Sequence, residues 1–189
     1  MNLPNILTVL RIVLTFVFIY FVLSPGLNAK ILAAFSFILA ALTDFYDGYL
    51  ARKKNIITDF GKLMDPIADK FLILAAFFVF AQMHLIAVWM VVVVAAREIL
   101  ITGHRIIVKR KGSVIPAEKA GKIKTTAQIA VICVVLLYLI LDEALNIPEA
   151  YFIILIINAL MVGVVLITTS SGISYINHYK FASNARVIS

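Results

Sequence analysis

Long apolar stretches recur along the chain, and short polar segments separate them. Six of these stretches reach about 20 residues, the length that a helix needs to cross ~30 Å of hydrocarbon. The predicted spans are residues 5–24, 30–51, 62–82, 85–108, 120–141 and 149–177. The pattern therefore predicts an all-α integral membrane protein with six transmembrane helices. We find no internal repeat or long polar linker, so we expect one membrane domain over residues 1–189.

The composition agrees with this prediction and excludes an ordinary soluble domain. Of the 189 residues, 63% are hydrophobic and 14% are charged, and the mean hydropathy is +1.05. Soluble domains carry about 25% charged residues. The formal net charge is +7, but the basic residues gather in short segments between apolar stretches, not on one face of a soluble module. We therefore expect membrane lipids as surroundings and no nucleic-acid partner.

The basic residues lie mainly in two polar segments, 52–62 and 105–124, and this asymmetry predicts the orientation. Lys and Arg are retained on the cytoplasmic side of a membrane, whereas Asp and Glu have little influence. The segments on the opposite side hold Lys30 as their one basic residue. Both termini are therefore predicted to be cytoplasmic.

Four aspartates lie where the second and third predicted spans approach the cytoplasmic side. Carboxylates in or near hydrocarbon are costly, and they usually mark a functional site. Asp44 and Asp47 are three residues apart, and Asp65 and Asp69 are four apart, so each pair shares one face of a helix. The basic turn between the pairs folds the second span back on the third. We therefore expect the four carboxylates to converge.

Four converging carboxylates repel one another unless a cation neutralises them. A set of oxygen ligands without His or Cys suits Mg²⁺ or Mn²⁺ better than zinc. Two such ions would form the clamp that commonly stabilises attack and departure at phosphorus. The sequence therefore predicts a site for two divalent ions. Gly48 and Gly61 leave room for a bulky ligand beside it, and Arg52 can contact a phosphate.

In order, these residues read Asp44-x2-Asp47-Gly48-x2-Ala51-Arg52-x8-Gly61-x3-Asp65-x3-Asp69, which resembles the signature of the CDP-alcohol phosphotransferases. The segments NLPNILTVLR, REILITGHR and GKIKTTAQ resemble the subgroup that makes phosphatidylglycerophosphate. The resemblance implies transfer of the phosphatidyl group from CDP-diacylglycerol to sn-glycerol 3-phosphate, with CMP as the second product. It also implies a homodimer. The positions of the basic segments predict that the active site faces the cytoplasm, and we expect a bacterial inner or plasma membrane, with an organelle membrane as the alternative.

The resemblance further implies roles for single residues. The metal ligands would be Asp44, Asp47, Asp65 and Asp69. Asp69 would also take the proton from the acceptor hydroxyl as the general base. Residues expected to bind CDP-diacylglycerol are Gly48, Ala51, Arg52, Gly61, Asn5 and Thr8. The acceptor phosphate is a dianion that needs fixed positive charge, for which the sequence offers Arg97, Arg105, Lys122, Lys124 and Arg11. Glu98 can orient a neighbouring Arg.

Three alternatives stay open at this point. A related phosphotransferase could use the same donor with inositol 1-phosphate or phosphatidylglycerol, because the aspartate signature does not determine the acceptor. A cation transporter would also hold aspartates in the membrane, although its site is expected at the midplane on broken, repeated helices. Finally, Lys70 and Arg97 could neutralise the aspartates in a structural salt-bridge network.

Overall fold

The computed structural model describes the backbone of residues 3–54, 59–110, 119–147 and 150–187, and the side chains of residues 6–43, 70–104, 108, 123–147 and 151–176. The described residues form six helices: α1 (Leu3–Leu23), α2 (Leu27–Lys54), α3 (Asp59–Gln82), α4 (Val88–Arg110), α5 (Lys119–Leu145) and α6 (Ala150–Val187). Each helix corresponds to one predicted span, although α4 begins three residues later than predicted, so the all-helical prediction is confirmed for the described residues. The longest, α6, has 38 residues.

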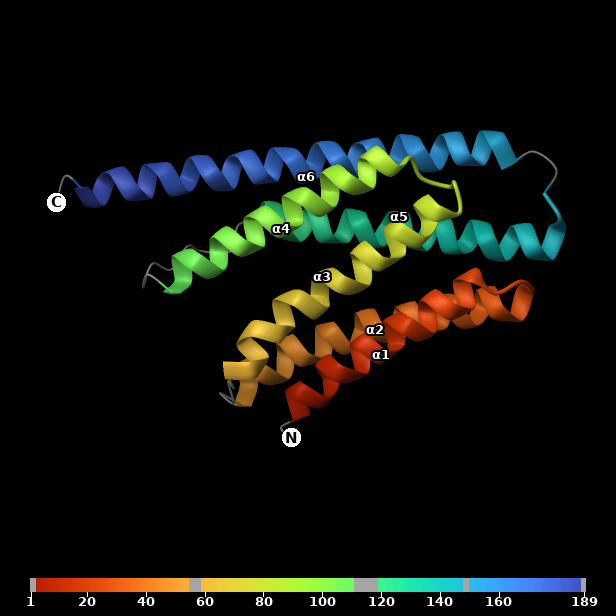
Figure 1. Ribbon diagram of the computed structural model, residues 1–189, viewed down its shortest axis with the longest axis horizontal. Helices are drawn as coiled ribbons and strands as arrows, with labels where there is room; N and C mark the ends of the chain where they lie inside the picture. Colours follow the sequence, from red (N-terminus) through yellow and green to blue (C-terminus); the bar gives the residue numbers. More distant parts are fainter. Residues whose placement is uncertain (1–2, 55–58, 111–118, 148–149, 188–189) are drawn as a thin grey trace.

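The helices form two groups, which α3 and the packing of α2 against α5 connect (Figure 1). In the first group, α1 lies along α2; in the second, α6 packs against both α4 and α5. Helix α3 contacts α1 and α2 on one side and α4 and α5 on the other. In Figure 1, α1 begins and α6 ends toward the left, where α2 also ends and α3 begins. Both ends of the helical part of the chain therefore lie toward the same end of the bundle.

Three helices are long and apolar enough, by length and composition, to cross a membrane. Among the described residues, these segments are Ile6–Leu23, Ile123–Leu145 and Tyr151–Ile176. Shorter apolar segments occur in α2 and α3, at Leu27–Thr43 and Lys70–Gln82. Many large apolar side chains face outward on all six helices, a surface that indicates contact with lipid. The chain is thus a membrane protein, and crossing by all six helices stays a prediction.

Phenylalanines from three helices fill the interior where α1, α2 and α3 meet. Phe18 and Phe80 are fully buried, and Phe37 is 1% exposed. The ring centroid of Phe18 lies 5.6 Å from that of Phe37 and 6.4 Å from that of Phe80. Aromatic pairs at these distances add about 0.5–1.5 kcal/mol beyond the burial of their area. This cluster fixes α1 and α2 against α3, the helix that carries half of the aspartate signature.

Lys30 is a buried residue of α2 that caps α1. Its Nζ donates hydrogen bonds to the carbonyl oxygens of Val22 at 2.8 Å and Ser24 at 2.9 Å. The last carbonyls of a helix have no partners within that helix, so they need donors from elsewhere. Lys30, which the sequence placed at the edge of a polar segment, therefore stabilises the turn between α1 and α2.

Asn158 holds α6 against the turn between α3 and α4. Its Oδ1 accepts a hydrogen bond from the Ala87 amide at 3.0 Å, and its Nδ2 donates to the Leu85 carbonyl at 2.9 Å. These two bonds supply partners to a main-chain amide and a main-chain carbonyl in a turn, where helical hydrogen bonds are not available. The Asn158 side chain thus connects helices that are far apart in the sequence.

We expect Asn158→Ala to lower the stability of the bundle. The substitution leaves the Ala87 amide and the Leu85 carbonyl without their side-chain partner, at a cost of about 1–3 kcal/mol. The measurement is the midpoint of thermal unfolding of the purified protein in detergent. Ser170→Ala is the matched control, because the Ser170 hydroxyl donates to the Ile167 carbonyl of its own helix. Equal shifts in the two variants would contradict the assigned role.

Candidate functional site

The four signature aspartates lie on two helices that contact each other. Asp44 and Asp47 belong to the C-terminal half of α2, and Asp65 and Asp69 belong to the N-terminal half of α3. Helical backbone at these positions supports the predicted sharing of one face by each pair. No three metal-ligating side chains come together among those the structure describes, but the aspartate side chains are not part of that set. Their convergence stays a prediction.

Several other predicted site residues have described backbone but lie outside the described side chains. They are Asn5 on α1, Gly48, Ala51 and Arg52 on α2, Gly61 on α3, Arg105 on α4, and Lys122 on α5. The helix register nevertheless relates two of them to described side chains. Arg105 lies about two turns beyond Glu98 on α4, and Lys122 lies two residues before Lys124 on α5.

The buried face of α6 changes from apolar to polar along its length. Ile157, Met161 and Val164 are buried, and Thr168 and Ser171 follow them at the same helical spacing and are also buried. The buried polar side chains of α4 and α5 are Glu98, Lys124 and Gln128. A polar layer in an otherwise apolar bundle costs free energy, and it usually marks a place where a ligand binds.

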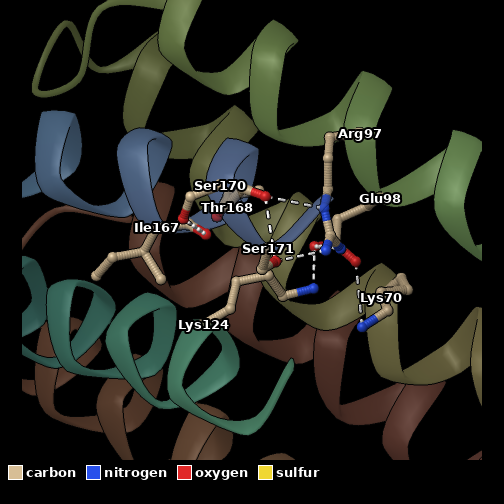
Figure 2. Close-up of polar contacts among 8 residues, drawn as sticks. All are labelled: Lys70, Arg97, Glu98, Lys124, Ile167, Thr168, Ser170 and Ser171. Atoms are coloured by element: carbon tan, nitrogen blue, oxygen red, sulfur yellow. Dashed lines mark hydrogen bonds and ion pairs between the residues drawn. The ribbon is translucent and has the colours of Figure 1, made fainter. Parts of the chain in front are cut away.

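Glu98 is the centre of this polar layer and contacts three cations (Figure 2). Its side chain is 3% exposed, and its Oε2 lies 3.2 Å from Lys70 Nζ on α3. Its Oε1 accepts a hydrogen bond from Lys124 Nζ on α5 and lies 3.3 Å from Nη1 of Arg97. The Arg97 contact agrees with the orienting role predicted for Glu98. One carboxylate therefore connects α3, α4 and α5.

Arg97 extends the layer to α6. Its Nε donates to the Thr168 carbonyl at 3.1 Å, and its Nη2 donates to the Ser171 hydroxyl at 2.6 Å. Figure 2 shows the guanidinium group between α4, which carries it, and this turn of α6. These α6 residues were not predicted from the sequence. A run of small polar residues in an otherwise apolar helix could have indicated them: Thr168-Thr169-Ser170-Ser171-Gly172.

The cluster of Lys70, Arg97, Glu98 and Lys124 carries more positive than negative charge. Among the described side chains, three cations surround one carboxylate, an excess of two positive charges within this cluster. Taking ions out of water costs several kcal/mol per ion, so such an excess favours binding of an anion. Lys70 and Arg97, which the structural alternative assigned to the aspartates, both contact Glu98. Part of their charge is therefore balanced by this acid.

The cluster adjoins the aspartate signature through α3. Lys70 directly follows Asp69, and the Cα atoms of adjacent residues are ~3.8 Å apart. The predicted general base therefore lies next in the chain to a cation that contacts Glu98. The helices that carry the aspartates also contact helices that carry the cations, since α3 packs against α4 and α5 and α2 packs against α5.

A second buried polar face lies on α1. Thr8 is 2% exposed and Arg11 is 1% exposed, and their spacing places them on one side of the helix. Helix α1 contacts α2 and α3, the two helices that carry the aspartates. The structure thus brings Arg11 beside the signature helices, whereas Arg97 and Lys124 meet at Glu98. The sequence predicts that Arg11, Arg97 and Lys124 bind the same acceptor phosphate. Two of them, Arg97 and Lys124, contact Glu98, whereas Arg11 lies on α1.

Comparisons with known proteins show which family the chain is similar to. The family model described as CDP-alcohol phosphatidyltransferase matches residues 1–171. The chain is 40% identical over 161 residues to the CDP-diacylglycerol–glycerol-3-phosphate 3-phosphatidyltransferase of Bacillus subtilis, covering 79% of this chain and 83% of the relative. A Rickettsia felis protein of the same name is 37% identical over 137 residues, with 72% and 75% covered. A probable phosphatidylglycerophosphate synthase of Mycobacterium tuberculosis is 35% identical over 178 residues, with 93% and 80% covered.

We expect the effects of Glu98→Gln and Lys124→Met on stability to be strongly non-additive. Glu98→Gln alone leaves the cations without their acid, and breaking a buried ion pair from one side costs about 3–5 kcal/mol. In the double variant one cation is also gone, so the loss should be smaller than the sum, with a coupling of about 0.5–3 kcal/mol. Unfolding by denaturant in detergent measures the four proteins of the cycle.

The control for this cycle is Glu143→Gln, which changes an exposed acid that accepts a hydrogen bond from the Gly26 amide. Glutamine can accept the same bond, so stability should barely change. Additive effects of the two cluster substitutions would show that Glu98 and Lys124 do not depend on each other.

Proposed function

Because the chain belongs to the CDP-alcohol phosphatidyltransferase family, we propose that it transfers the phosphatidyl group of CDP-diacylglycerol to sn-glycerol 3-phosphate. The products are phosphatidylglycerophosphate and CMP. Relatives whose names state this reaction support the proposal, since this chain covers at least 75% of the length of each one compared. The observation that carries it is the cluster of cations around the buried Glu98, which begins one residue after Asp69.

Proteins of this family generally use divalent metal ions, and the donor set of the signature fits such ions. Four carboxylates on two adjoining helices are hard oxygen ligands, which Mg²⁺ and Mn²⁺ prefer. We assign two ions to Asp44, Asp47, Asp65 and Asp69. When bound, the ions neutralise the pyrophosphate of the donor and stabilise CMP as the leaving group.

Asp69 acts on the acceptor. Its carboxylate takes the proton of the acceptor hydroxyl, and the oxygen attacks the β-phosphorus of CDP-diacylglycerol. The new bond joins this oxygen to phosphorus, and the bond between phosphorus and the CMP oxygen breaks. The donor lies along the helix faces that carry Gly48, Ala51, Arg52, Gly61, Asn5 and Thr8.

The acceptor phosphate lies among cations, with Arg97 and Lys124 nearest to Glu98. The excess of two positive charges in the cluster matches a phosphate dianion. Arg105 on α4, Lys122 on α5 and Arg11 on α1 add further positive charge. This charge excess favours a phosphomonoester acceptor over phosphatidylglycerol, whose single phosphodiester carries one negative charge. Inositol 1-phosphate stays the second candidate acceptor, since it is also a phosphomonoester.

We place all six helices across a bacterial inner or plasma membrane, with both termini and the active site on the cytoplasmic side. The basic segments 52–62 and 105–124 adjoin the C-terminal ends of α2 and α4 and the N-terminal ends of α3 and α5. Positive charge is retained in the cytoplasm, where glycerol 3-phosphate is also found. A homodimer follows from the family resemblance.

The direct test of this proposal is turnover by purified protein in detergent with CDP-diacylglycerol, labelled glycerol 3-phosphate and Mg²⁺. We expect label to enter a lipid while CMP is released, and chelation of the metal to stop both. Parallel reactions with inositol 1-phosphate and phosphatidylglycerol determine the acceptor. A faster reaction with either of these, or no lipid product with glycerol 3-phosphate, would overturn the proposal.

We expect Asp69→Asn to lower kcat by about 10²–10⁴-fold, the usual contribution of a general base. The amide cannot take the proton, but the remaining aspartates still hold the donor, so the KM for CDP-diacylglycerol should change little. Asp142→Asn, which alters an acid near the other end of α5, is the control and should keep normal turnover. Near-normal kcat in Asp69→Asn would remove the base assignment.

A further inference from the structure

Gly172 on α6 leaves the space that the Arg97 side chain occupies. A Cβ atom at Gly172 would lie 3.3 Å from Arg97 Nε and 3.5 Å from Arg97 Cγ. A Cβ atom at Gly163 on the same helix, or at Gly103 on α4, would meet nothing within 4 Å. Close approach of a polar side chain thus distinguishes Gly172 from these two glycines.

The same turn of α6 supplies two acceptors for the Arg97 guanidinium group. One is the Thr168 carbonyl, and the other is the Ser171 hydroxyl. In an α-helix, a side chain leans toward the N-terminus and covers the turn before it. A side chain at position 172 would therefore lie over the carbonyl of residue 168. Glycine exposes this carbonyl to Arg97, so the contact and the glycine depend on each other.

We propose that Thr168, Ser171 and Gly172 form a socket that fixes the Arg97 guanidinium for the acceptor phosphate. This inference rests on the proposed function, because it takes Arg97 as a ligand of that phosphate. The three residues act through Arg97 and are positioning residues. They give α6, which carries none of the signature aspartates, a part in acceptor binding.

The socket fixes the guanidinium plane from several directions. Nε and Nη2 are held by α6, and Nη1 lies 3.3 Å from Glu98 on α4. Arginine binds phosphate through a planar fork, so the orientation of this plane decides how well its N–H groups reach the oxygens. A side chain that is already oriented loses less entropy when the ligand binds. The socket therefore raises affinity for the acceptor.

A displacement of Arg97 would also affect Lys124, the second cation assigned to the acceptor phosphate. Arg97 and Lys124 both contact Oε1 of Glu98. Moving the guanidinium group alters the partner that also orients Lys124. The effect should fall on the acceptor, whose phosphate both cations are assigned to bind, and not on CDP-diacylglycerol.

The experiment compares Gly172→Ala and Gly172→Val with Gly163→Ala and Gly163→Val. We expect Gly172→Ala to raise the KM for glycerol 3-phosphate roughly 3–10-fold. Misplacing a binding group by 1 Å can lower the rate by about 10²-fold, and the added Cβ should displace the Arg97 side chain by less than that. The valine at 172 should have a larger effect. The KM for CDP-diacylglycerol should stay constant, and both variants at 163 should behave as the unaltered protein.

Thermal unfolding separates this effect from a loss of structure. Alanine is favoured over glycine in helices by about 1 kcal/mol, so Gly172→Ala should unfold at the same or a higher temperature while it binds acceptor less well. Ser171→Ala should raise the same KM, and Ser171→Thr should restore it because the hydroxyl returns. If the variants at 172 do not fold, the Ser171 pair decides the question.

The inference is overturned if Gly172→Ala matches Gly163→Ala, or if the KM values of both substrates rise together. Where only the Ser171 pair can be measured, an unchanged acceptor KM in Ser171→Ala overturns it. Arg105→Gln tests the proposed acceptor site without touching the socket, and it should raise the KM for glycerol 3-phosphate. If Arg105→Gln raises the KM for glycerol 3-phosphate but the variants at Gly172 and Ser171 do not, the socket is rejected and the proposed acceptor site is retained. If Arg105→Gln leaves this KM unchanged, the proposed position of the acceptor site is wrong.

Discussion

An ion inside an apolar helix bundle must be met by an opposite charge or by a ligand, and Glu98 meets three such ions at once. Lys70, Arg97 and Lys124 come from three different helices and contact this one buried carboxylate. Their meeting point fixes the relative positions of α3, α4 and α5, and Arg97 adds α6 through its contacts with the Thr168–Ser171 turn. The excess positive charge makes the layer ready for an anion.

The hydrophobic pattern predicted all six helices, because a span of apolar residues is a local property of the sequence. The signature aspartates could be placed on α2 and α3 for the same reason, since their spacing needs only the helical repeat. The contact between Lys70 and Glu98 could not be predicted, because it depends on the tilt and register of two helices. Thr168 and Ser171 were missed because small polar residues in membrane helices often serve packing alone. Lys30 was similarly taken for an indicator of topology, whereas it caps α1.

We propose that the site divides its tasks among the helices. The carboxylates assigned to the metal ions and to the proton belong to α2 and α3. The acceptor cations come chiefly from α4 and α5, and the α6 turn holds one of them. Lys70 follows Asp69 in α3 and contacts Glu98, so the residue proposed to activate the hydroxyl is next in the sequence to the cluster assigned to the phosphate. In this proposal, one bundle selects a phosphorylated alcohol and makes its hydroxyl reactive.

The most direct measurement is the change in thermal unfolding when the acceptor is added without the donor. Glycerol 3-phosphate at about 100 times its Kd should stabilise the protein by about 2.7 kcal/mol, whereas glycerol, which lacks the phosphate, should not. The stabilisation should largely disappear when Arg97 and Lys124 are replaced together by Gln and Met, because both cations assigned to the phosphate are then gone. Equal stabilisation by glycerol, or an undiminished effect of glycerol 3-phosphate on the double variant, would contradict an acceptor phosphate held by the Glu98 cluster.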